Sequence, residues 1–159
     1  MKKNILALFV MLAFAASTQA QIVKFTATVG DPEMDNMLTS IHNQALKDIT
    51  AFHNNVVNTF NIVGSKVDAA LKILAPGDVY MAAQLSLSAN KPFDEVVKTY
   101  SANKSKGWGA MAKEMGIKPG SPEFHAMKKS MKSKGNSANK GNSKGNAKGN
   151  SGNGKGKKK

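Results

Sequence analysis

The sequence predicts an all-α fold with one long N-terminal helix, about five short helices and a disordered basic C-terminal tail. Apolar residues recur at steps of three and four residues over positions 34–63, which is the period of one helix face. After position 127 the chain becomes a repeat of Gly, Asn and Lys, which cannot bury enough apolar surface to offset its chain entropy. The length of 159 residues allows one small domain with such appendages.

Residues 1–20 have the layout of a secretory signal peptide. A basic start precedes an apolar run at 5–16, and residues 18–20 read Thr-Gln-Ala, a small-x-small cleavage site. The alternative is a membrane anchor, but this run is too short to cross about 30 Å of hydrocarbon. We therefore expect an exported protein, periplasmic or extracellular, without a transmembrane segment, whose mature chain begins near Gln21.

Residues 21–30 alternate between apolar and polar side chains, the period of an extended segment. No second strand is obvious in the sequence, so we expect an arm that lies on helices rather than a strand of a sheet.

The helical domain is expected over residues 31–127. Asp31 and Pro32 form a helix start, with an N-cap acceptor followed by Pro at the first helical position. The expected long helix runs about 30 residues, or roughly 45 Å, to Gly64. Its apolar stripe comprises Met34, Leu38, Ile41, Ala45, Ile49, Phe52, Val56, Phe60 and Val63.

Gly, Pro and Asn then divide the domain into short helices. We expect them at 67–74, at 79–89 with Leu87 facing inward, from Pro92 through Tyr100, at 108–115, and after Ser121.

The net charge of +13 describes the tail and not the domain. Residues 21–127 hold ten Lys and all ten acidic residues, which cancel, whereas residues 128–159 hold eleven Lys and no acid. The chain contains no Arg, which excludes bidentate Arg clamps on phosphate, and no Cys, which excludes disulfides and lipidated Cys.

An acid-free lysine segment binds polyanions by counterion release, with little sequence selectivity. Outside the cytoplasm the candidate partners are DNA, acidic polysaccharide and anionic cell surfaces. A non-interacting, solubilising tail is the alternative. The predicted polyanion-binding residues are Lys128, Lys129, Lys132, Lys134, Lys140, Lys144, Lys148, Lys155, Lys157, Lys158 and Lys159.

Trp108 is the only Trp and lies between Gly107 and Gly109. One interpretation is a core anchor, packed where Gly permits close backbone approach. The other is an exposed aromatic that recognises a sugar or a base.

A stretch of the domain resembles a module of uncharacterised exported bacterial proteins, in which a "GWG…LGI.PGS.EFH" pattern precedes a Lys/Gly/Asn-rich end. The resemblance rests on Gly77-Asp78-Val79, on residues 91–96 and on the run GWGAMAKEMGIKPGSPEFHAMKK, about a third of the chain. Met115 stands where the pattern has Leu, a mild change for a core position. The resemblance implies a secreted helical module and no activity.

The sequence favours a non-enzymatic protein without cofactor or metal. It contains no GxSxG, HExxH or P-loop motif. His42 and His53 share a face of the expected long helix, but about 16 Å apart along it, too far to bind one metal ion.

An alternative function is that of a structural or adaptor protein. The long apolar stripe is more than the short helices need cover, and an exposed remainder would pair with a partner helix or with a second copy.

Overall fold

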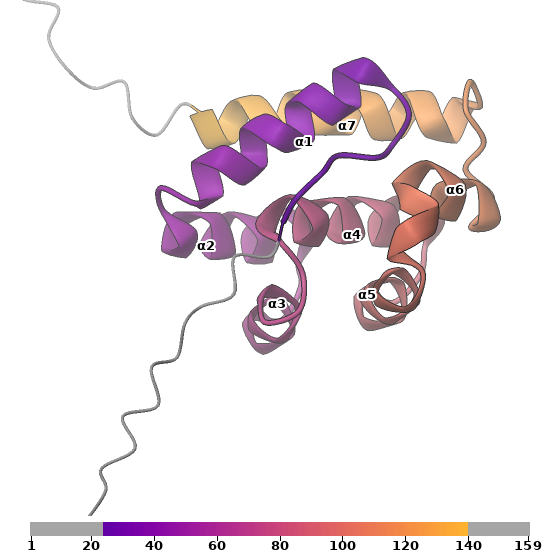
Figure 1. The fold of residues 1–159 in the computed structure, drawn as a ribbon. Helices are drawn as coiled ribbons and strands as arrows, with labels where there is room; N and C mark the ends of the chain where they lie inside the picture. Colours follow the sequence, from indigo (N-terminus) through magenta and orange to yellow (C-terminus); the bar gives the residue numbers. More distant parts are fainter. Residues whose placement is uncertain (1–23, 140–159) are drawn as a thin grey trace, which may run out of the picture.

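The computed structural model describes residues 24–139, which form seven α-helices, one short 3-10 helix and no strand (Figure 1). The all-α prediction is confirmed for this part of the chain. The expected signal peptide and the residues from Lys140 onward lie outside the described residues. The elements are α1 (Pro32–Ala45), α2 (Ile49–Phe60), α3 (Gly64–Leu71), α4 (Pro76–Ala89), α5 (Phe93–Ala102), η1 (Lys104–Lys106), α6 (Gly107–Glu114) and α7 (Pro122–Asn139).

Helix α4 lies at the centre of the fold. It packs against each of the six other α-helices, and every residue from Gly77 to Leu85 is buried. Small and apolar side chains on all sides make such a helix stable only inside a core. Near the C-terminal end of α4 this burial ceases, and Leu87, which we expected to face inward, is 54% exposed.

The expected single long helix is wrong: the chain breaks it into α1 and α2 at residues 46–48. Asp48 caps α2 by accepting a hydrogen bond from the backbone N–H of Ala51 at 2.8 Å. A straight helix of roughly 45 Å would extend beyond a domain about 30 Å across. The break lets Phe52 and Val56 reach the core, while Ile49 and Val63 of the predicted stripe are exposed.

The short helices begin within three residues of the predicted positions, since Gly and Pro punctuate the sequence there. The last helix differs most. It continues to Asn139, so the expected start of a disordered tail at Lys128 falls inside α7. Met127 and Met131 on consecutive turns of α7 are buried against the rest of the fold, which holds this part of the chain as a helix.

Ion pairs fix α7 to the start of α1. The Lys128 ammonium lies 2.8 Å from the Asp31 carboxylate and 2.9 Å from that of Glu33, and Lys132 also pairs with Glu33. Hydrogen bonds from these lysines lower the pKa of Asp31 and of Glu33. Since Asp31 also caps α1 through the N–H groups of Glu33 and Met34, one carboxylate joins the two helices.

We expect the C-terminal part of α7 to contribute to stability. A chain that stops after Met127 loses Met131 and the ion pairs of Lys128, and its free energy of unfolding should fall by about 2–5 kcal/mol in urea titrations. A chain that stops after Asn139 keeps these contacts and should stay within about 0.5 kcal/mol of the full chain. Equal stability of the two truncated chains would contradict this account of α7.

Candidate functional site

Residues 24–30 cross the body as an arm without regular secondary structure before the chain enters α1 (Figure 1). The ring of Phe25 stacks on that of His42 in α1, with centroids 4.5 Å apart. The carbonyl of Thr28 accepts a hydrogen bond from the N–H of Gly109 at 3.1 Å. Residues 24–30 of the expected arm thus contact α1 and α6, and residues 21–23 lie outside the described residues.

Three glycines form a cradle for this arm: Gly77, Gly107 and Gly109. A Cβ on Gly109 would lie 2.3 Å from the carbonyl oxygen of Val29, and one on Gly77 would lie 2.5 Å from the ring of Phe25. Gly107 has φ +75°, a conformation that side chains rarely adopt. The close backbone approach that we inferred at the Gly-Trp-Gly motif is therefore made by the N-terminal arm.

Beneath the arm, Asp78 of α4 accepts two buried hydrogen bonds on one carboxylate oxygen. Trp108 donates its indole Nε1–H at 2.8 Å, and Tyr100 donates its hydroxyl at 3.0 Å. The rings of Tyr100 and Trp108 stack with centroids 3.7 Å apart. The network joins α4, α5 and α6, and the backbone N–H of Trp108 extends it to the arm through the Thr28 hydroxyl at 3.3 Å.

Burial governs the ionisation of this network. It raises the pKa of Asp78 above its ordinary value of 3.8, although the two hydrogen bonds and the nearby Lys104 and His42 act in the opposite direction. Burial also raises the pKa of Tyr100 and lowers that of His42. The folded state therefore favours neutral forms around Asp78.

Trp108 is completely buried, and its only polar side-chain atom is engaged by Asp78. An indole in this position cannot stack on a sugar or a base without leaving the core. Its place corresponds to the core-anchor interpretation, and the network binds α4, α5 and α6 together. Within residues 24–139, no group of three or more His, Asp or Glu side chains could hold a metal ion.

The predicted lysines fall into four groups. Lys128 and Lys132 are engaged in ion pairs with α1, and Lys129 is exposed on α7. Lys134 lies within α7, and its side chain is not described. The other seven, from Lys140 to Lys159, lie outside the described residues.

The sequence analysis did not single out Asp78 as a site residue. It lies in the first turn of α4, where acids are common. No short motif marks a buried acid whose donors lie 22 and 30 residues further along the chain. The available signal was that Asp78 directly precedes the run Val-Tyr-Met-Ala-Ala at 79–83. A helix that is apolar on all sides is buried, which predicts that an acid on it is buried too.

No family model matches the chain, and neither the curated proteins nor the solved structures searched contain a match. The resemblance to exported bacterial proteins therefore stays a prediction. No helix among the described residues has the length and apolar character needed to cross a membrane.

Substitution of Gly109 by Ala should displace the arm. Gly to Ala inside a helix ordinarily stabilises by about 0.5–1 kcal/mol, but here the new Cβ meets the backbone of Val29 at 2.3 Å. We expect a loss of about 1–3 kcal/mol and faster proteolysis within the arm. The control is Ala110→Ser at the exposed neighbouring position. Stabilisation by Gly109→Ala would show that the arm does not need this cradle.

Two substitutions of Asp78 separate its acceptor role from its charge. Asp78→Ala leaves the buried donors of Trp108 and Tyr100 without an acceptor and should cost about 2–5 kcal/mol of unfolding free energy. Asp78→Asn keeps an acceptor oxygen, removes the ionisable carboxyl and should stay within about 1 kcal/mol of the parent at neutral pH. Urea titration measures both.

The pH dependence provides the control. Since the pKa of Asp78 is raised by folding, its contribution is fully present below about pH 3.8 and is lost as the pH rises through the folded-state value. Asp78→Asn does not titrate, so its stability relative to the parent should improve from about pH 4 to about pH 7. A constant difference across this range would refute the raised pKa.

Proposed function

We propose that this chain is an exported, non-enzymatic protein that binds polyanions through its basic C-terminal segment. The helical body, in which Lys and acidic residues cancel, carries that segment. The observation that carries the proposal is the composition of residues 140–159, which hold seven Lys and no acid. Such a segment attracts DNA, acidic polysaccharide or an anionic cell surface by releasing their counterions. Export rests on the signal-like residues 1–20.

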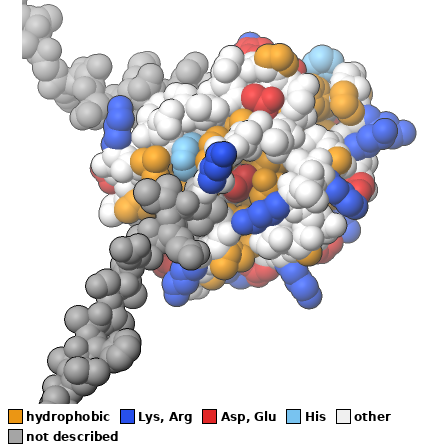
Figure 2. Space-filling model, in the orientation of Figure 1, with side chains coloured by type: hydrophobic (Ala, Val, Ile, Leu, Met, Phe, Trp, Pro, Cys, Tyr) orange, Lys and Arg blue, Asp and Glu red, His pale blue; other side chains and the backbone are white. Residues whose placement is uncertain are grey.

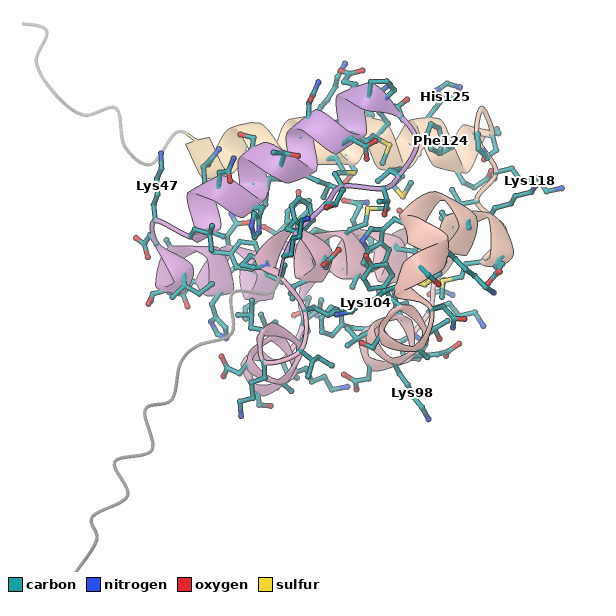
Figure 3. All side chains as sticks on the ribbon, in the orientation of Figure 1. Lys47, Lys98, Lys104, Lys118, Phe124 and His125 are labelled. Carbon is teal, nitrogen blue, oxygen red and sulfur yellow. The ribbon has the colours of Figure 1, made fainter. Side chains whose placement is uncertain are left out.

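The charges of the body support this division of roles. Lys66, Lys91 and Lys106 pair with acids, and Lys104 donates to the carbonyl of Ile73. The lysines on the visible face are scattered rather than gathered in one patch (Figure 2). Lys47, Lys98 and Lys118 project from the body in three different directions (Figure 3). A polyanion meets no continuous basic surface on this face.

Helix α7 joins the body to the basic segment. Its buried methionines and the ion pairs of Lys128 and Lys132 fix α7 to the body as far as residue 132, so these two lysines belong to the fold more than to ligand binding. We therefore place the binding set at Lys129, Lys134 and the seven lysines from Lys140 onward.

The adaptor alternative loses its main argument. The apolar stripe of residues 34–63, which we expected to be larger than the short helices could cover, is divided between α1 and α2. Most of it is buried against α4 and α7. Met34, Leu38 and Val56 are completely buried within the chain. No specific observation on the remaining stripe favours helix pairing over polyanion binding.

Replacement of the seven lysines at 140–159 by Gln should abolish tight binding. The logarithm of the binding constant for duplex DNA falls linearly with the logarithm of the salt concentration, with a slope of about −0.9 per lysine–phosphate contact. Loss of seven such contacts should make the slope less negative by up to about 6. Fluorescence anisotropy with DNA and with an acidic polysaccharide, over about 50–200 mM salt, measures both affinity and slope.

The matched control replaces the body lysines Lys47, Lys98 and Lys118 by Gln, which should change the slope little because these side chains point apart. Unchanged binding by the seven-Gln chain, or binding that is insensitive to salt, would overturn the proposed function.

A further inference from the structure

The ring of His42, in the last turn of α1, contacts both the N-terminal arm and the first turn of α4. Phe25 of the arm stacks on this ring, with centroids 4.5 Å apart and the two planes at 28°. The backbone N–H of Gly77 in α4 donates to its Nδ1 at 3.5 Å. Phe25 also lies against Gly77, where a Cβ would come within 2.5 Å of the Phe25 ring. His42, Phe25 and Gly77 thus form a single half-buried contact between the arm and two helices.

The Nδ1 atom of His42 supplies an acceptor that α4 otherwise lacks. The N-cap of α4 is Ala75, and no side chain caps this helix end. The first N–H groups of a helix have no acceptor within the helix, and its N-terminus carries a partial positive charge. Nδ1 can accept from Gly77 only while it has no proton. The contact therefore requires the neutral ring of His42, with its proton on Nε2.

Protonation of His42 opposes this contact in three ways. It removes Nδ1 as an acceptor, and it places a positive charge at the positive end of α4. Phe25 also covers the ring and withholds the water that an imidazolium needs. Burial accordingly lowers the pKa of His42 below its ordinary value of 6.5, although the Asp78 carboxylate attracts the charged form. Departure of Phe25 would return water to the ring and favour the proton.

Asp78 is the charged group of α4 that acts on His42, and Lys104 acts in turn on Asp78. On the arm, the basic residue beside Phe25 is Lys24, whose side chain is exposed. Helices α7 and α2 also pack against α1, and their paired ionisable side chains are engaged with other groups: Lys128 and Lys132 with Asp31 and Glu33, and His53 with Asp68. The force that opposes release of the arm therefore comes from Asp78.

We propose that His42 is a pH-sensitive latch for the N-terminal arm: its neutral ring holds residues 24–28 on the body, and its protonation releases them. Val29 stays in place, because its side chain is buried and its N–H donates to Asp35 Oδ1 at 2.8 Å. Release uncovers the glycine cradle and frees the N–H groups of Trp108 and Gly109, which the arm engages through Thr28. Polyanion binding by residues 140–159 plays no part in the latch, so either proposal can fail without the other.

The two titrating groups under the arm act in opposite directions. His42 binds a proton more readily when the arm is released, so docking is fully favoured above about pH 6.5 and weakens as the pH falls below it. The raised pKa of Asp78 has the opposite sign and favours the folded, docked state as the pH falls toward 3.8. Asp78→Asn removes this second titration together with the attraction for the imidazolium, and it should deepen the release.

Amide hydrogen exchange, measured by NMR, reports the position of the arm. The N–H groups of Trp108 and Gly109 lie in the first turn of α6 and donate to Thr28. After correction for the intrinsic pH dependence of exchange, the protection of Gly109 should fall at least about threefold between about pH 8 and about pH 5. The amide of Leu85, in the buried part of α4, reports unfolding of the whole domain and separates it from release of the arm.

Three variants test the latch. His42→Gln has no titrating ring, so the protection of Gly109 should lose its pH dependence, whereas His125→Gln changes an exposed His on α7 and should keep it. Gly77→Ala should leave Gly109 weakly protected at both pH values, because the new Cβ meets Phe25. A parent chain whose Gly109 protection does not fall toward pH 5, or a His42→Gln chain that keeps the fall, would overturn the latch.

The titration of the His42 ring gives a second readout that leaves this residue unchanged. Because protonation and docking are linked, removal of the arm contact should return the pKa of His42 toward 6.5. Phe25→Ala should therefore raise the midpoint of the His42 ring resonances in an NMR titration. Thr26→Ala, at the exposed neighbouring position of the arm, should not. Equal midpoints in the parent and in Phe25→Ala would overturn the latch even if His42→Gln does not fold.

Discussion

The complete burial of one helix is the constraint on which the rest of the fold depends. Between Gly77 and Leu85, α4 has no side facing water, so the six other α-helices must surround it. A chain without Cys has no disulfide to support such a core, and it must hold by packing and by satisfied polar groups. Two polar side chains that enter the core with α4 are bonded: Asp78 to aromatic donors, and Gln84 to Ser88 and Ser130. The buried hydroxyl of Tyr80, also on α4, has no hydrogen-bond partner among the described residues.

The N-terminal arm closes this core from outside. It contacts α1 through Phe25, and α6 through Thr28, and it requires Gly109 where its backbone passes closest. The Gly-Trp-Gly motif thus has two structural tasks in consecutive residues. The indole fills the core and donates a hydrogen bond to Asp78. The glycines, which have no side chain, leave room for the N-terminal arm, some 80 residues earlier in the sequence.

Helix α7 connects the body to the basic residues 140–159. Within α7, Met127 and Met131 are buried, and Lys128 and Lys132 pair with acids at the start of α1. Residues 140–159 hold seven Lys and no acid. The contacts that stabilise the fold therefore lie before Asn139, whereas most of the lysines proposed to bind polyanions lie beyond it. A truncation after Met127 would remove both together, whereas replacement of lysines beyond Asn139 addresses binding alone.

Local chemistry in the sequence determined the all-α class, the cap at Asp31 and the short helices, because helix period, Pro, Gly and capping side chains act over a few residues. The acid-free lysine segment is equally a property of sequence alone. Only the tertiary structure decided the break at Asp48, since a continuous stripe does not reveal how long a helix the core can accommodate. It also decided the burial of Asp78 beside Trp108, because a hydrogen bond across 30 residues depends on packing that no local pattern records.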